Sequence, residues 1–204
     1  MYLVNDEFYA GGENHGVAWK AKKNGIIWRG EASGGRAGED VWHHFHRYRL
    51  VQMLNGTTVS QTEKSNERSL AFDMLSRRLY RSQALSRGRI GAWLDGSANA
   101  GFVKLCPPGT HQHGYKYLPD VDGNSFSARY HGFLPSSSLP LKATIYAERH
   151  DDGLTPWMHF APFDNTFHDL YSILDYFADG PGRPGDTAAQ FVAKKLVRRG
   201  RSRF

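Results

Sequence analysis

The sequence predicts an α/β fold in which helices flank a mainly parallel sheet. Short apolar segments typical of buried strands alternate along the chain with segments in which apolar residues recur at helical spacing. Several strand-like segments run directly into glycine turns, as at Gly30 and Gly123. In folds of this class, ligands bind beyond the carboxyl ends of the strands. With 204 residues, of which 40% are hydrophobic, the chain is long enough to bury a sizeable core.

The expected elements follow from apolar periodicity and from turn residues. Strand-like segments cover residues 25–30, 90–94, 101–106, 115–121, 138–146 and 156–161. Helical spacing covers residues 39–54, 69–81 and 167–177, and a further helix is expected to begin at Asn124 or Ser125 and to stop before Pro135. The polar residues 61–68 are expected to form a loop. Residues 1–179 are predicted to form one domain, followed by a Gly/Pro linker and a basic C-terminal helix or tail over residues 180–204.

The stretch 113–133 has the order strand, glycine turn, helix. Asn124 and Ser125 are residue types that cap helix N-termini, where free amides and the helix dipole attract anions. Arg129 follows Ser125 by four residues and is expected on the same helix face. The stretch therefore predicts an anion site. The alternative is an ordinary buried helix, since apolar residues recur at Phe126, Tyr130 and Phe133.

A second strand end has similar chemistry. The segment 25–30 leads into a loop of small residues, with Arg29 at the strand end and Ser33 in the loop. Glycines such as Gly30 let a backbone approach a ligand closely, and a guanidinium can hold an oxyanion through two hydrogen bonds. The structural alternative is a surface arginine at a strand end, since exposed arginines are common.

Charge and composition exclude several classes of function. No apolar run approaches the length of a membrane helix, and the N-terminus has no pattern typical of a signal peptide. Cys106 is the single cysteine, so we expect no internal disulfide and no thiolate zinc site. The net charge of +6 is located in a basic tail. Its cations are Lys194, Lys195, Arg198, Arg199, Arg201 and Arg203. Because this tail has no interleaved aromatic residues, we expect no nucleic-acid partner.

No metal site is expected. His43 and His46 share one helix face, but no third ligand is placed beside them. His111 and His113 lie in a loop without obvious partners.

The ordered motifs of the chain resemble a known family. They are residues 22–30 with Ser33 to Arg36, Tyr115 to Tyr117, residues 120–130, residues 137–139, Glu148 and residues 156–159. In this order and spacing they resemble glycosyltransferase family 90, the capsule-associated-protein type that includes protein O-glucosyltransferases, and the fungal branch in particular. The resemblance covers nearly all of the chain up to Phe177.

The resemblance implies a Rossmann-like half of a GT-B glycosyltransferase, the C-terminal half that binds the donor. It implies a function as an inverting enzyme that transfers a sugar, xylose or glucose, from a UDP-sugar to a hydroxyl of a glycan or protein acceptor. The N-terminal half, with its membrane anchor and catalytic base, is expected to be incomplete or missing here. The catalytic residue is therefore unknown. A catalytically dead nucleotide-sugar-binding remnant, or a binding module, is the alternative.

The resemblance also assigns a donor-binding set. It comprises Arg29, Gly30, Ser33, Asp122, Ser125, Phe126, Ser127, Arg129 and Glu148. The arginines and the predicted helix start would hold the diphosphate, and Glu148 would bind the ribose. The structural alternative for Glu148 is a surface carboxylate paired with a nearby cation. Asp122 is expected in a turn or against a sugar hydroxyl. Manganese held by Asp120 and Asp122, at the Asp-x-Asp spacing of other glycosyltransferases, is the alternative that we do not favour.

Location follows the same resemblance. Full-length family members are expected in the Golgi or the lumen of the endoplasmic reticulum. Without a recognisable signal or membrane segment, this chain is expected to be either cytoplasmic or the product of a truncated gene model.

Overall fold

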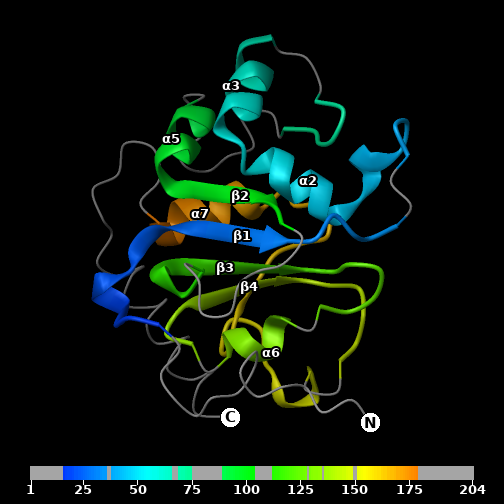
Figure 1. The fold of residues 1–204 in the computed structure, drawn as a ribbon. Helices are drawn as coiled ribbons and strands as arrows, with labels where there is room; N and C mark the ends of the chain where they lie inside the picture. The colour runs from blue at the N-terminus through cyan, green and yellow to red at the C-terminus, as the bar shows by residue number, and fades with distance from the viewer. Residues whose placement is uncertain are drawn as a thin grey trace.

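The chain forms a parallel sheet with helices on both faces (Figure 1). The computed structural model describes residues 16–35, 38–65, 69–74, 89–103, 112–127, 129–134, 136–148 and 151–178. Five strands in these ranges pair side by side, all in the same direction. The predicted α/β class is confirmed, and the architecture is that of a Rossmann-like half-domain.

The elements have the following bounds. The strands are β1 (Lys23–Gly30), β2 (Ala98–Phe102), β3 (Tyr115–Val121), β4 (Leu139–Ala143) and β5 (Ala161–Pro162). The helices are α2 (His46–Met53), α3 (Gly56–Ser65), α5 (Ile90–Ser97), α6 (Arg129–Phe133) and α7 (Leu170–Ala178). Short 3-10 turns cover Trp19–Ala21, Trp42–His44, Gln112–Gly114 and Asp151–Gly153.

The strand order creates one point at which the chain reverses its direction across the sheet. The order is β2-β1-β3-β4-β5, so the chain moves outward from β1 to β2 and then continues on the other side from β3. Parallel crossovers are right-handed, so opposite directions of travel place the connecting helices on opposite faces. The connections after β1 and β3 therefore continue toward opposite faces of the sheet. The carboxyl ends of β1 and β3 form the topological switch point at which folds of this class bind ligands.

Alternating strand residues divide the core between the two faces. Ile26 and Trp28 of β1 belong to the main core cluster, together with buried side chains of α2, α5 and α7. Ile27 of β1 points to the other face and packs with Leu118 of β3 and Phe133 of α6. In Figure 1, α7 lies behind β1 and β2, while α6 lies beside β4. The face that carries α6 will be called the α6 face.

Several predicted elements are confirmed. The segments 25–30 and 115–121 are β1 and β3, and β4 lies within the predicted segment 138–146. The predicted apolar stripe of α7 is buried, namely Leu170, Tyr171, Leu174 and Phe177. The helix starts later than predicted, because Phe167 has a left-handed backbone with φ of 63° and cannot continue a helix.

Two local predictions are wrong. The segment 90–94, predicted as a strand, begins α5, and the segment 61–65, predicted as loop, ends α3. The two errors have one cause, which is that the helices stabilise each other. The Glu63 carboxylate of α3 accepts hydrogen bonds from the amides of Ile90 and Gly91, each at 3.1 Å. A cap supplied by another helix is not visible in local sequence patterns.

Three other predicted segments also differ from the structure. The predicted helix 39–54 is interrupted at Phe45, whose extended backbone separates a 3-10 turn from α2. Residues 69–74 are not helical, and the rest of the predicted helix 69–81 lies outside the described residues. Most of the predicted strand 156–161 is a turn in which the amides of Met158 and His159 donate to the carbonyl of Thr155. The linker and tail also lie outside the described residues.

The contact between α3 and α5 depends on glycine at position 91. A Cβ atom there would lie 2.5 Å from the amide nitrogen of Ser60 and 2.6 Å from the carbonyl oxygen of Gly56. We expect Gly91→Ala to push the helices apart and to lower the free energy of unfolding by about 1–3 kcal/mol. Gly96→Ala, in the same helix with nothing within 4 Å, is the matched control and should be neutral or stabilising. Urea titration of the variants measures both values, and equal effects would contradict the packing argument.

Candidate anion-binding site

The loops after β1 and β3 are tied together at the switch point. The Asn124 side chain accepts hydrogen bonds from the amides of Gly34 and Gly35, both at 3.0 Å. These glycines have φ of 117° and 142°, which other residues rarely adopt. Asn124 therefore orders the neighbouring loop and caps no helix. The predicted helix start at 124 or 125 is wrong, since α6 begins at Arg129.

This shift changes the predicted anion site. A helix of five residues has too few aligned peptides for the dipole on which the prediction depended. Ser125 is exposed and its carbonyl accepts a hydrogen bond from the amide of Gly123 at 3.0 Å. Phe126 is 53% exposed. Ser127 is buried, and its hydroxyl donates to Asp120. Arg129 therefore does not share a helix face with Ser125.

Arg47 of α2 crosses the switch point from the main core side. Its guanidinium donates to the backbone carbonyl of Asp122 at 3.2 Å, to that of Glu31 at 3.2 Å and to the Ser33 hydroxyl. The side chain is buried. A Cβ atom at Gly123 would lie 2.6 Å from its Nη2 atom, so the β3 turn fits closely around this group. Arg47 thus joins α2 to the ends of β1 and β3.

Arg129 reaches the same place from the α6 face. Its guanidinium donates to the backbone carbonyl of Arg29 at 3.2 Å, and its central carbon lies 5.0 Å from the centre of the Trp28 ring. The path passes Gly30, where a Cβ atom would overlap the guanidinium and lie 2.9 Å from the Trp28 ring. Because Gly30 has no side chain, Arg129 can cross the end of β1 and contact a tryptophan of the opposite face.

The two guanidinium groups meet around one aromatic ring. The central carbon of Arg47 lies 6.0 Å from the Trp28 ring centre. Burial and, secondly, the charge of Arg129 lower the pKa of Arg47 to about 10. The repulsion is offset by ring contacts, by backbone carbonyls and by the charges of Asp120, Glu31 and Asp122. Two cations held together at a switch point are a candidate site for an anion with more than one charge.

Asp120 is the buried acidic neighbour of this pair. Its side chain is fully buried, and one oxygen accepts the Ser127 hydroxyl hydrogen bond. The other oxygen, Oδ2, has no hydrogen-bond partner among the described residues. Burial raises the pKa of Asp120 to about 6, although the Ser127 hydrogen bond and the charges of Arg129 and Lys142 lower it. The carboxyl can therefore change its charge near neutral pH.

Asp122 connects the ends of β3 and β4. Its carboxylate accepts hydrogen bonds from the Thr144 hydroxyl and from the amide of Ile145, the latter at 2.7 Å. The side chain is 3% exposed. Asp122 was expected in a turn or against a sugar hydroxyl, and its carboxylate instead ties β3 to the segment after β4. Because both oxygens of Asp122 accept hydrogen bonds and Asp120 is fully buried, the Asp-x-Asp pair does not present open oxygens to a hydrated ion.

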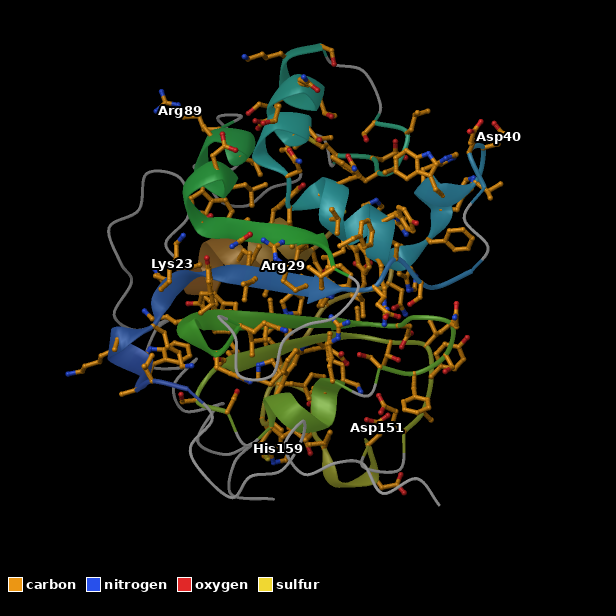
Figure 2. The ribbon with its side chains drawn as sticks, viewed as in Figure 1. Lys23, Arg29, Asp40, Arg89, Asp151 and His159 are labelled. Carbon is orange, nitrogen blue, oxygen red and sulfur yellow. The ribbon has the colours of Figure 1, made fainter. Side chains whose placement is uncertain are left out.

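Glu148 belongs to a separate ion-pair cluster on the α6 face. The buried ammonium of Lys142 lies 3.3 Å from Glu148 and 3.3 Å from Asp151, and 4.2 Å from the centre of the Tyr130 ring. Figure 2 shows Asp151 and His159 on this side of the sheet, near α6. Glu148 has the geometry of the alternative stated above, a carboxylate paired with a cation.

Arg29 turns along the sheet. Its guanidinium donates to the Asn99 side chain of β2 and lies beside Gly101, where a Cβ atom would come within 2.7 Å of Nη1. Figure 2 shows Arg29 over the middle of the sheet and Lys23 at the opposite end of β1. The two predicted arginines therefore contribute differently, since Arg29 offers its carbonyl oxygen to Arg129 while its side chain points to β2.

Arg47 was not part of the predicted donor set, and Asp120 was considered only as a manganese ligand. Arg47 precedes Leu50 and Leu54 by three and seven residues, so it falls on the buried stripe of its helix. An arginine on an apolar stripe is a recognisable sign of a buried cation. Asp120 follows Leu118 by two residues along β3, so its side chain points to the same face as Leu118, the α6 face. This spacing was also readable from the sequence.

Comparison with known protein families and with curated proteins finds no match to this chain. The resemblance to glycosyltransferase family 90 therefore stays a prediction. Among the described residues, no group of three or more histidine, cysteine, aspartate or glutamate side chains is arranged to hold a metal ion. None of the helices in the described ranges has the length and apolar composition needed to cross a bilayer.

Asp120 predicts a particular dependence of stability on pH. A carboxyl whose pKa rises from 3.8 to about 6 on folding destabilises the native state progressively as pH rises from about 4 to about 6. Relative to Asp120→Asn, the parent chain should lose on the order of 2 kcal/mol of stability between pH 4.5 and 7.5. Thermal or urea unfolding at pH 4.5 and 7.5 measures the difference. The control is Asp40→Asn, an exposed carboxylate (Figure 2), whose curve should follow that of the parent chain.

Proposed function

We propose that this chain binds the diphosphate of a nucleotide sugar at the switch point, as the donor-binding half of a glycosyltransferase. The observation that supports this proposal is the meeting of Arg47 and Arg129 around Trp28 at the carboxyl ends of β1 and β3. Ligands of parallel α/β folds bind at this position of the sheet. Guanidinium groups match the geometry of phosphate oxygens and stay charged at neutral pH.

The chemistry of sugar transfer requires such cations. When the bond between the sugar and the diphosphate breaks, negative charge grows on the leaving phosphate oxygens. Arg47 and Arg129 are already held in position by backbone carbonyls, so little reorganisation is needed when that charge develops. Because two guanidinium groups can neutralise a diphosphate, the proposal requires no metal ion. The sugar, xylose or glucose, and the glycan or protein acceptor follow from the resemblance alone.

The first test is donor binding. We expect calorimetry on the full chain to detect binding of UDP-glucose or UDP-xylose. Arg129→Gln should weaken this affinity roughly ten- to a hundredfold, because it removes charge-assisted hydrogen bonds. Arg129 is half-buried at the carboxyl end of β1, and the melting temperature of the variant shows whether its fold is retained. Absence of binding by the parent chain would contradict the proposed function.

The matched control is Arg89→Gln. Arg89 precedes α5, is exposed, and lies far from α6 in Figure 2. The substitution makes the same change in net charge but removes no contact at the switch point. Its affinity should stay within about twofold of the parent chain at physiological salt, where distant exposed charges are screened. An equal loss in both variants would indicate a general charge effect instead of a site.

A second candidate function is binding without sugar transfer. It is favoured because the nearby carboxylates are buried, hydrogen-bonded or paired with a cation. Asp120 is fully buried, Asp122 accepts two hydrogen bonds, and Glu148 and Asp151 pair with Lys142. None of these four groups is presented as a general base to an acceptor hydroxyl, as transfer would require.

Turnover separates the two candidates. The full chain would be incubated with a radiolabelled UDP-sugar, with and without glycan and peptide acceptors, and released UDP and labelled product would be measured. If a base lies within the chain, we expect UDP release that Arg129→Gln reduces by at least about tenfold. Binding without UDP release would support the second candidate. Release that is insensitive to Arg129→Gln would place the reaction elsewhere.

A further inference from the structure

The Asp120 carboxyl lies beside the arginine pair but is not used by any step proposed above. It is enclosed on β3, and the described elements around it contribute charged, titratable or hydrogen-bonding groups. These are Ser127, Arg129 and Tyr130 of the α6 region, Lys142 of β4, Glu148 and Asp151 after β4, Arg29 of β1, Asp122 of β3, and Arg47 and His46 of α2. Arg129 is the largest charged contributor that favours the ionised carboxylate.

Two of these neighbours have partners elsewhere. The ammonium of Lys142 already contacts Glu148 and Asp151, at 3.3 Å each. The Arg29 side chain donates to Asn99 of β2. Arg129 is the cation that most favours the ionised Asp120, and Asp120 is the charge that most favours the protonated Arg47, so Asp120 offsets the same pair that is proposed to hold the anion. A carboxylate and a ligand anion near the same cations repel each other.

We propose that Asp120 is a positioning residue that couples anion binding at the switch point to the uptake of a proton. This inference rests on the proposed function. When the site is empty, the ionised carboxylate balances the charge of Arg129. When a diphosphate binds, its charge replaces that of Asp120, and the buried carboxylate takes a proton from the solvent on Oδ2, the oxygen without a hydrogen-bond partner among the described residues. No bond to the ligand forms or breaks in this step.

The sign of the coupling follows from the charges. Burial places the pKa of Asp120 at about 6 in the empty site, and a nearby anion raises it further. If the anion raises this pKa by about one unit, about half a proton is taken up per anion bound at pH 6.5. The affinity should then rise as pH falls from 7.5 to 5.5, by at most about tenfold.

The probe must not titrate in this range. The diphosphate of a nucleotide sugar is esterified at both ends and lacks the phosphate ionisation near pH 6. UDP-glucose is therefore suitable, whereas UDP is not. Calorimetric titration of the full chain at pH 6.5, in three buffers of different ionisation enthalpy, measures the number of protons taken up on binding. We expect about half a proton for the parent chain and less than about a tenth for Asp120→Asn.

Three further variants separate Asp120 from its surroundings. Asp169→Asn removes another partly buried carboxyl of raised pKa, in the turn before α7, and should leave the proton uptake unchanged. His46→Gln removes the nearby histidine, whose pKa burial lowers, and should retain most of the uptake. Ser127→Ala removes the hydrogen bond that favours the ionised carboxylate, so maximal uptake should move to higher pH. If Asp120→Asn does not fold, the pH shift expected for Ser127→Ala still tests the role of Asp120.

The outcomes distinguish this inference from the proposed function. Binding of UDP-glucose with proton uptake that Asp120→Asn abolishes supports both. Binding without uptake, or uptake that persists in Asp120→Asn, overturns the role of Asp120 and leaves the donor site intact. Absence of binding overturns the proposed function and the coupling together. A purely structural role for Asp120 predicts lower stability in the variant without any change in protons per anion.

Discussion

The contact of two guanidinium groups with the ring of Trp28 is the interaction on which this edge of the protein depends. Arg47 reaches the ring from α2 and Arg129 reaches it from the α6 face, across the end of β1. Arg129 can cross only because Gly30 has no side chain. Like charges in a partly buried setting repel strongly, so the arrangement requires compensation. The carbonyls of Glu31, Asp122 and Arg29 provide part of it, and these carbonyls belong to the strand ends and loops that surround the switch point.

The need to compensate buried charge also explains how the neighbouring polar groups are arranged. Asp122 uses both carboxylate oxygens to tie β3 to the segment after β4. Lys142 is buried beneath α6, where it contacts two carboxylates and the Tyr130 ring. These groups are satisfied by neighbours, as buried charges must be. Asp120 differs, because one of its oxygens has no hydrogen-bond partner among the described residues. A buried group that costs stability is more often retained for function than for folding.

The structure changes which residues are suitable for a donor site. Of the two arginines expected to hold a diphosphate, Arg129 lies at the switch point, whereas the side chain of Arg29 turns to β2. The second cation at the site comes from Arg47 of α2, a helix from which no donor-binding residue was predicted. Glu148, expected at a ribose, is engaged by Lys142. The anion-binding proposal therefore rests on geometry, while the sugar, the acceptor and the transfer reaction rest on the resemblance of motifs.

Local patterns were sufficient for the strands that form the centre of the sheet and for the last helix. The apolar run 25–30, the segment 115–121 and the stripe of α7 each have one clear periodicity, so the sequence by itself determined the α/β class. Only the tertiary structure decided the elements and side chains whose partners are distant. The segment 90–94 is helical because Glu63, from another helix, caps its amides. Arg47 became part of the site because the strand order brings the ends of β1 and β3 together beneath it. Contacts between residues far apart in the chain leave no local periodicity to read.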